Sequence, residues 1–219
     1  MLQAAIFDMD GLLFDTERLC CEAWRSVSFE AGYKMDDALF FACVGRNNRD
    51  TRTIVLESCG PDFPYDDFSD KARAWMTERM KVNGPPEKSG IRILFDFLSA
   101  LSIPIALATS TSEKSARWMI ERAGLTSYFS GWAFGSEVER GKPEPDIFQL
   151  ALLRLGVADP SKCVVFEDSP AGLTAALTAG MKAVFVPDMI VPDNEILGKI
   201  WKRIDSLDEA AFESFYSDI

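Results

Sequence analysis

The chain has 219 residues, of which 47% are hydrophobic, and carries a formal net charge of -11 at pH 7. This length and apolar content suit one large domain, or a core with a smaller insert, around a buried hydrophobic centre. The excess of acidic residues argues against a nucleic-acid-binding surface, which usually carries a basic patch. It still allows a small anionic substrate held by a local positive group.

The chain contains no histidine, which excludes Ser-His-Asp and Cys-His catalysis and histidine-based metal sites. Its five cysteines include no C-x-x-C pair, a poor basis for disulfides or zinc, so we expect a reducing, cytoplasmic location. No basic segment precedes the first apolar residues, as a signal peptide would require. The longest apolar stretch, Ile91–Thr109, is interrupted by charges and a proline, so no membrane association is expected.

The first predicted element is a buried strand over the short apolar run Gln3–Phe7, which is followed by Asp-Met-Asp-Gly. Apolar residues then recur at helical spacing over Thr16–Ala31, and Gly32 is the expected C-cap. Further helical patterns follow, with no convincing strand between them, at Asp36–Val44, Asn48–Ser58 and Asp66–Val82. The segment Gly84–Gly90 is rich in glycine and proline and is typical of a linker.

After residue 90 the pattern changes to strands that alternate with helices. The expected helices are Ile91–Leu101, Glu113–Ala123, Asp146–Leu155 and Ala171–Ala179, and the expected strands are Ile103–Ala108, Gly131–Phe134, Cys163–Phe166 and Ala183–Val186. Such alternation predicts parallel strands joined by right-handed crossovers. The sequence therefore predicts an α/β fold, a Rossmann-like doubly wound parallel sheet, that is interrupted after its first strand by an all-helical insert.

Polar residues stand in four clusters after the predicted strands. They are Asp8 and Asp10, then Thr109 and Ser110, then Lys142, and finally Glu167 and Asp168. The ligand site of a doubly wound sheet lies beyond the carboxyl ends of the strands, so we expect these side chains to meet there. Carboxylates, hydroxyls and one lysine suit phosphoryl transfer assisted by a hard cation such as Mg²⁺, which prefers oxygen ligands.

The chemistry suggests a role for each of these groups. A carboxylate can attack phosphorus to form an acyl-phosphate, which divides one displacement into two easier steps. Because carboxylate and phosphate repel each other, a cation must bridge them, and Asp168 would hold it, with Glu167 as a further candidate. A second aspartate two residues away can protonate the leaving oxygen and later accept a proton from water. Thr109 and Lys142 would hold the non-bridging phosphoryl oxygens.

Some of these residues also have purely structural interpretations. The hydroxyl run Thr109–Ser112, taken alone, favours a helix N-cap. The segment 167–170 is typical of a helix start, an interpretation that is compatible with metal binding by Asp168. The adjacent cysteines Cys20 and Cys21 are interpreted as core packing, because no nearby group would generate a thiolate.

Four segments resemble, in order and spacing, the motifs of the haloacid-dehalogenase-like phosphohydrolases: FDMDGLLFDTE, ALATS, GKPEPDIF and VVFEDSPAGLTAALTAG. The resemblance covers nearly the whole chain and is strongest to the β-phosphoglucomutase and sugar-phosphatase branch, in which a small helical cap follows the first motif. It implies a phosphotransfer core domain of residues 1–14 and 85–219 and a helical cap domain of residues 15–84.

The resemblance implies that Asp8 is the nucleophile and that Asp10 is the general acid and base. It also implies an Mg²⁺ ion bound by Asp8, by the backbone carbonyl of Asp10 and by Asp168, with Glu167 as a further candidate ligand. Thr16 falls at the hinge of the cap.

The resemblance further assigns the substrate contacts. Thr109, with Ser110 nearby, would bind the phosphoryl group, and Lys142 would support it. Gly45 and Arg46 fall in the loop of the cap that is expected to set specificity. The implied partner is a small phosphorylated metabolite bound by a monomer, because a cap of this kind sterically suits monomers.

One position departs from the pattern of the family. Many relatives carry DT-E-x-x-H-x-x-A-W, whereas this chain reads DTERLCCEAW, with Cys20 where the histidine would stand. In the mutases that histidine orients the acid/base group when a sugar is the acceptor. The mutases also carry a basic residue before the cap-loop glycine, and here Cys43 and Val44 precede Gly45. Both differences favour a phosphatase.

The sequence therefore predicts an Mg²⁺-dependent phosphatase that hydrolyses a small phosphomonoester, a sugar or polyol phosphate, through an aspartyl-phosphate. A hexose-phosphate mutase of the β-phosphoglucomutase type is the alternative on the same scaffold. A non-catalytic metabolite-binding protein is the alternative of another class.

Overall fold

The computed structural model describes residues 2–33 and 35–207. Its centre is a six-stranded, all-parallel sheet with the strand order β3-β2-β1-β4-β5-β6. The strands are β1 (Ala4–Phe7), β2 (Ile105–Thr109), β3 (Phe129–Phe134), β4 (Cys163–Glu167), β5 (Lys182–Phe185) and β6 (Lys202–Arg203). Because β1 pairs with both β2 and β4, the chain winds outward from it in two directions. The predicted doubly wound, Rossmann-like sheet is confirmed.

The central strands are apolar along their whole length. All residues of β1, β2 and β4 are buried. Such continuous apolar runs are typical of parallel strands that are covered by helices on both faces. Neighbouring residues of β1 point to opposite faces, so that Ile6 and Phe7 belong to two different hydrophobic clusters.

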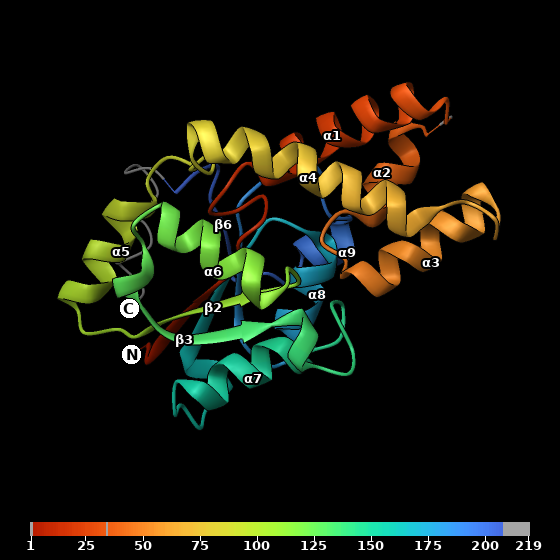
Figure 1. Ribbon diagram of the computed structural model, residues 1–219. Coiled ribbons are helices and arrows are strands. Elements are labelled where there is room, and N and C mark those ends of the chain that lie inside the picture. The colour runs from red at the N-terminus through yellow and green to blue at the C-terminus, as the bar shows by residue number, and fades with distance from the viewer. Residues whose placement is uncertain (1, 34, 208–219) are drawn as a thin grey trace.

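Helices cover both faces of the sheet (Figure 1). On one face α5 (Ile91–Ala100) and α6 (Glu113–Arg122) share a hydrophobic cluster with Phe7. On the other face α7 (Asp146–Arg154) and α8 (Pro170–Thr178) share a cluster with Ile6. Within the described part of the chain, no helix combines the length and apolar character needed to cross a membrane.

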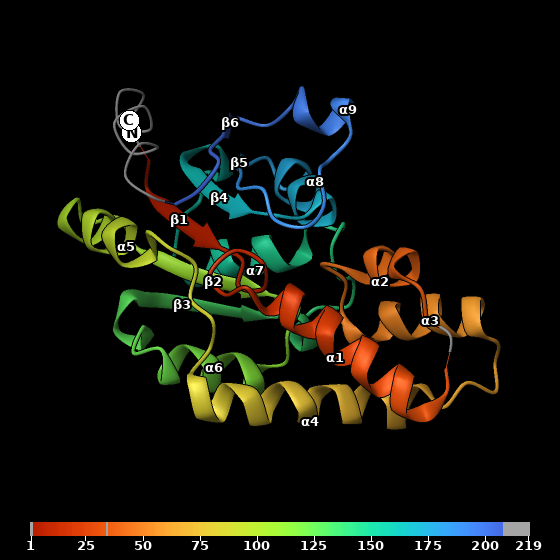
Figure 2. The ribbon, with the colours of Figure 1, turned by 90° about the horizontal axis from the view of Figure 1, so that it is seen from above.

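Four helices lie between β1 and α5 in the sequence, and they bury a separate hydrophobic cluster. In this cluster the Trp24 ring makes edge contacts with the rings of Phe40 and Phe68, each at 5.3 Å between ring centroids. The four helices are α1 (Thr16–Ala31), α2 (Asp37–Cys43), α3 (Asn48–Cys59) and α4 (Tyr65–Asn83). Figure 2 shows this helical insert beyond the carboxyl ends of β1, β2 and β3. The insert therefore stands over the edge at which a doubly wound sheet binds its ligand.

The two chain segments that join the insert to the sheet are paired with each other. The backbone N–H of Asp15 donates to the Pro86 carbonyl at 2.8 Å, and the N–H of Lys88 donates to the Leu13 carbonyl at 2.9 Å. Although these segments are about 70 residues apart in the sequence, they run side by side as two linkers. Backbone hydrogen bonds therefore tie the two linkers to each other.

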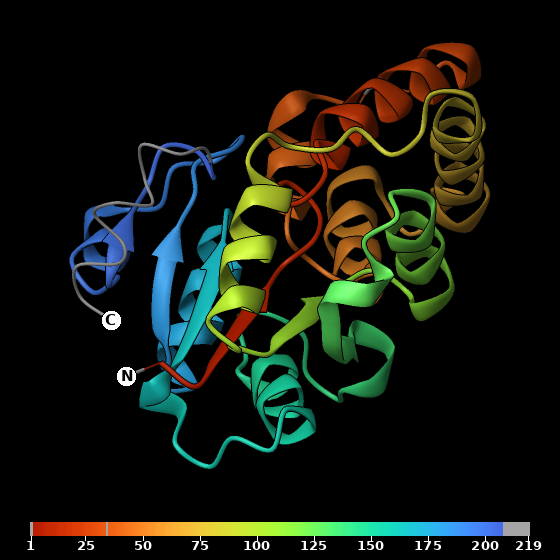
Figure 3. The same cartoon turned by 90° about the vertical axis from the view of Figure 1, so that its left-hand side faces the viewer.

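Two short elements after β5 were not predicted from the sequence. They are α9 (Asn194–Leu197) and β6, which is an edge strand of the sheet; the blue part of the chain that contains both lies on the left in Figure 3. Neither is long enough to show a helical or strand periodicity. The structure also shifts the limits of all five predicted strands by one or two residues; for example, β3 begins at Phe129 instead of Gly131 and β2 begins at Ile105 instead of Ile103. Three short 3₁₀ helices, at Thr126–Tyr128, Gly135–Glu137 and Pro160–Lys162, complete the described elements.

Candidate active site

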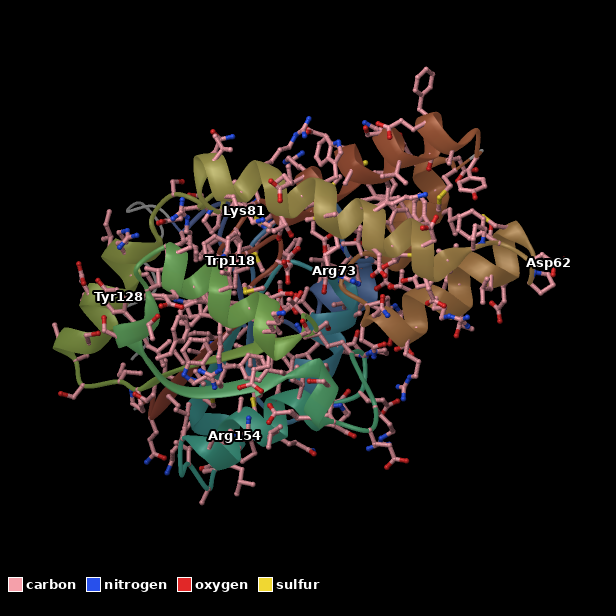
Figure 4. All side chains as sticks on the ribbon, in the orientation of Figure 1. Asp62, Arg73, Lys81, Trp118, Tyr128 and Arg154 are labelled. Carbon is pink, nitrogen blue, oxygen red and sulfur yellow. The ribbon has the colours of Figure 1, made fainter. Side chains whose placement is uncertain are left out.

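A cavity of about 910 Å³ lies where the helical insert meets the carboxyl ends of the strands. Figure 4 labels three of its lining residues, Arg73 and Lys81 on α4 and Trp118 on α6. Six residues that the sequence analysis placed in the site also line this cavity: Asp8, Asp10, Gly45, Arg46, Ser110 and Lys142. The structure therefore brings residues from the core and from the insert to one cavity.

Lys142 is buried between two carboxylates. Its ammonium group donates to Oδ1 of Asp8 at 2.5 Å and to Oε1 of Glu167 at 2.6 Å. Burial alone would lower the pKa of Lys142, but the charges of Asp8 and Glu167 outweigh it and raise that pKa. Lys142 is therefore a cation at neutral pH, and it fixes one oxygen of Asp8. Among the described residues, no donor is bonded to the other oxygen.

The protonation of Asp8 reflects this crowded setting. Burial raises the pKa of Asp8 to about 7; the charge of Lys142 opposes this rise, and the charges of Glu167 and Asp10 add to it. The ion pair with Lys142 thus does not by itself compensate for the burial of Asp8. A further positive charge at this position would favour the carboxylate.

Three buried carboxylates form a candidate cation site. Oxygen atoms of Asp8, Glu167 and Asp168 lie within 4.8 Å of one another. Oδ1 of Asp168 is buried and has no hydrogen-bond partner among the described residues. The single positive charge of Lys142 does not balance the negative charges of three carboxylates. The remaining negative charge is costly in a buried position. The donor set therefore fits a hard divalent cation such as Mg²⁺, which prefers oxygen ligands.

Glu167 differs from the other two carboxylates because protein donors already occupy both of its oxygens. Oε1 accepts from Lys142, and Oε2 accepts from the backbone N–H and the hydroxyl of Ser169, at 2.7 and 3.0 Å. A Cβ at Gly172, in the first turn of α8, would lie 1.7 Å from Oε1 of Glu167. The geometry favours Asp8 and Asp168 as cation ligands, with Glu167 holding Lys142 in place.

Three threonine hydroxyls surround the carboxyl group of Asp10. Thr16 donates to Oδ1 at 2.7 Å, whereas Thr111 and Thr109 donate to Oδ2 at 2.8 and 3.3 Å. Thr16 is the first residue of α1, so the insert helps to orient Asp10. The Thr109 side chain is fully buried and lies against Asp10, while Ser110 and Thr111 reach the cavity wall. Phosphoryl binding by Thr109 and Ser110 stays a prediction.

The loop between α2 and α3 reaches residues that follow the strands of the sheet, Ser110 and Ser169, at Gly45. This residue has φ = +75°, and a Cβ here would lie 2.8 Å from Oγ of Ser169. Its N–H donates to Oε1 of Glu17 and its carbonyl accepts from the Ser110 hydroxyl, both at 3.4 Å. Only glycine combines this backbone conformation with so close an approach. The next residue, Arg46, lines the cavity.

Glu17 and Cys20 lie on the same wall of the cavity. The sequence analysis did not place Glu17 in the site, although it lies three residues before Cys20 on one face of α1. Burial and the charge of Asp10 raise the pKa of Glu17 to about 8, and the N–H of Gly45 opposes this rise. Cys20 also packs against the hydrophobic cluster of the insert, as interpreted from the sequence, and burial raises the pKa of its thiol well above the ordinary value.

Most of the chain matches one family of known proteins. Residues 5–186 match the family described as haloacid dehalogenase-like hydrolase. The chain is 36% identical over 186 residues to the phosphorylated carbohydrates phosphatase of Thermotoga maritima, covering 84% of each chain. It is 31% identical over 182 residues to the fructose-1-phosphate phosphatase YqaB of Escherichia coli, covering 83% of this chain and 94% of the relative.

The fold is also similar to that of a solved structure. The crystal structure of β-phosphoglucomutase from Clostridium difficile superimposes with a TM-score of 0.83 at 24% identity, covering 99% of this chain and 96% of the other. The four motifs that suggested the family in the sequence fall within the matched residues. The chain is a member of the haloacid dehalogenase-like hydrolase family.

Proposed function

We propose that the protein is an Mg²⁺-dependent phosphatase that hydrolyses a small phosphomonoester through an aspartyl-phosphate on Asp8. One observation carries this proposal. Lys142 holds one oxygen of Asp8 at 2.5 Å, and Asp8 faces the cavity together with Asp10. A fixed carboxylate nucleophile beside a second carboxyl group is the arrangement that a two-step phosphoryl transfer needs.

In the first step the free oxygen of Asp8 attacks phosphorus. The bond between phosphorus and the ester oxygen breaks, and Asp10 gives its proton to that leaving oxygen. In the second step water attacks the phosphorus of the aspartyl-phosphate and its proton passes to Asp10. The bond between Asp8 and phosphorus then breaks, inorganic phosphate is released, and both residues return to their starting states.

The remaining residues of the site orient these two groups. Asp8, Asp168 and the backbone carbonyl of Asp10 would hold Mg²⁺, which when bound offsets the repulsion between the attacking carboxylate and the phosphoryl oxygens. Lys142 supports the phosphoryl group and Ser110 binds one of its oxygens. Thr109 helps to orient Asp10, because its hydroxyl donates to Oδ2 of Asp10 at 3.3 Å.

We propose that residues 15–84 act as a cap domain on a core of residues 1–14 and 85–219; residues 1, 34 and 208–219 lie outside the described residues. The separate hydrophobic cluster of the insert and the paired linkers support this division. A closed cap excludes bulk water from the reaction and surrounds the part of the substrate that carries no phosphate.

The substrate class follows from the wall of the cavity and from the relatives. Arg46, Arg73 and Glu17 offer charged and polar groups, and the rings of Trp24 and Trp118 offer apolar surface. Sugar and polyol phosphates present both hydroxyl groups and C–H faces, which match such a mixed lining. The names of the Thermotoga and Escherichia relatives, phosphatases of phosphorylated carbohydrates and of fructose-1-phosphate, support a sugar phosphate.

The lining of the cavity favours hydrolysis over the mutase alternative. The side chain at the position of the mutase histidine is Cys20, and it lines the cavity. Among the described residues, the side-chain hydrogen bonds to the carboxyl group of Asp10 all come from threonines, Thr16, Thr109 and Thr111. Asp10 is therefore positioned without a histidine on the cap.

Phosphate release from a panel of sugar, polyol and nucleotide phosphates, measured with Mg²⁺ and with Asp8→Asn as the blank, tests the proposal. We expect release from at least one sugar or polyol phosphate and a blank at background. Phosphate transfer within a hexose phosphate, stimulated by a sugar bisphosphate and with little free phosphate, would favour the mutase. No turnover of any compound would favour the binding protein.

A further inference from the structure

Asp188, in the segment after β5, is a buried carboxylate that the proposed mechanism does not use. Its side chain is fully buried, with 0% exposed. Its Oδ2 has no hydrogen-bond partner among the residues that the structure describes. A buried carboxylate oxygen without a donor is costly unless a charge or a polar group compensates for it.

The unpartnered oxygen of Asp188 borders the proposed cation site. A Cβ added to Gly11 would lie 2.2 Å from Oδ2 of Asp168 and 3.2 Å from Oδ2 of Asp188, so both carboxylates face one point beside Gly11. Asp168 also carries a buried, unpartnered Oδ1. Asp188 is not one of the three carboxylates whose oxygens lie within 4.8 Å of one another. It therefore faces the site from farther out, a position that suits Mg²⁺ because this cation keeps several waters.

The other oxygen of Asp188 contacts both sides of the connection to the insert. Oδ1 accepts from Nζ of Lys88 at 2.6 Å and from Nη2 of Arg18 at 3.2 Å. Lys88 belongs to the linker that enters the core, and Arg18 lies in the first turn of α1. Oδ1 of Asp188 thus contacts Lys88 on one linker and Arg18 at the start of α1. Oδ2 of the same side chain faces the cation site.

We propose that Asp188 is a positioning residue that couples the cation site to the linkers of the cap; the inference rests on the cation site of the proposed function. A cation held by Asp168 would compensate for the charge on Oδ2 of Asp188 and would fix the orientation of the Asp188 carboxylate. Oδ1 then holds Lys88 and Arg18 in the arrangement that pairs the linkers. Because coupling between two sites is reciprocal, pairing of the linkers raises the affinity of the site for the cation.

The first test measures cation binding without turnover. Mn²⁺ binding to the substrate-free protein is followed by electron paramagnetic resonance for the wild type, Asp188→Asn, Asp168→Asn and Asp37→Asn. Asp37 pairs with Arg25 and both side chains are exposed, so its change removes the same charge without removing a contact of Asp188 or of the linkers. We expect Asp188→Asn to weaken binding about tenfold, as for residues outside the ligand set that orient a metal site. We expect no change for Asp37→Asn.

The same series separates this inference from the proposed function. Loss of Mn²⁺ binding in Asp168→Asn, with wild-type affinity in Asp188→Asn, overturns the role of Asp188 and leaves the cation site standing. Wild-type affinity in both variants overturns the cation site and the inference together.

The second test reads the linkers themselves. The N–H groups of Asp15 and Lys88 form the cross-linker hydrogen bonds, so their hydrogen exchange reports on linker pairing. We expect Mg²⁺ to slow both exchange rates in the wild type and to leave them unchanged in Asp188→Asn. Lys88→Gln keeps every carboxylate and is expected to lose the Mg²⁺ effect at Asp15 as well, which tests the coupling if Asp188→Asn folds poorly. Slowing by Mg²⁺ in either variant, equal to that in the wild type, overturns the coupling.

Discussion

The ammonium group of Lys142 lies 2.5 Å from Oδ1 of Asp8, across 134 positions of the sequence, and both side chains are buried. This contact joins the loop after β3 to the end of β1, the central strand. It leaves one oxygen of the proposed nucleophile for attack and keeps the other fixed.

Replacing Lys142 by Met should damage both stability and activity. Two buried carboxylates, Asp8 and Glu167, would lose their shared cation, and breaking a buried pair of this kind costs about 3 kcal/mol. We expect that decrease in the free energy of unfolding, measured with urea in EDTA, and a fall in phosphate release of about 1000-fold with Mg²⁺. Lys71→Met, which removes an exposed pair with Asp67, is the control and should change little. Equal behaviour of the two variants would contradict the role of Lys142.

Replacing Thr111 by Val should impair catalysis more than binding. The Thr111 hydroxyl lies 2.8 Å from Oδ2 of Asp10, and without it the proton donor is less well oriented. We expect kcat to fall about tenfold or more and KM to change less than twofold. Thr53→Val removes a hydroxyl that bonds to a backbone carbonyl on the exposed side of α3, and it should leave both constants unchanged. A rise in KM at constant kcat would instead assign Thr111 to substrate binding.

Replacing Gly45 by Ala should separate the cap loop from the core. A methyl group there would meet Oγ of Ser169 at 2.8 Å, and φ is +75°. Gly60 provides a matched control because its φ is +98° but nothing lies within 4 Å of the added Cβ. Both variants carry backbone strain of roughly 1–3 kcal/mol because both φ values are positive, whereas only Gly45→Ala disturbs closure. We expect kcat/KM to fall about tenfold in Gly45→Ala and to stay near the wild-type value in Gly60→Ala.

Replacing Glu17 by Gln should make the stability of the protein less dependent on pH. The pKa of Glu17 rises from 4.5 to about 8 on folding, chiefly because of burial, so the folded state binds this proton more tightly. The wild type therefore loses stability as the pH rises from about 4.5 to 8, a loss that a neutral amide cannot show. We expect Glu17→Gln to be more stable than the wild type by about 2 kcal/mol at pH 8 and to differ little from it at pH 4.5. The difference at pH 8 is kept to this size because water in the cavity solvates part of the Glu17 carboxylate.

Thermal unfolding of the two proteins at both pH values, without metal, gives this comparison. The same difference at both pH values would mean that Glu17 is charged in the folded protein.

Two classes of information were available from the sequence. The parallel sheet was predictable because its strands are continuous apolar runs, a local signal that burial on both faces imposes. The family was predictable because its motifs are short and stand directly after these strands. A hydrophobic pattern needs several residues to be recognised. For this reason β6, with two residues, and α9, with a single turn, were not predicted.

The sequence alone therefore determined the family, the order of the main elements and the carboxylates that meet at the ends of the strands. Only the tertiary structure decided what holds each of them. Thr111 reaches Asp10 across 101 positions and Lys88 reaches Asp188 across 100, and no local pattern encodes such pairs. They exist because the sheet brings its strand ends to one edge and the paired linkers fold the insert back over that edge.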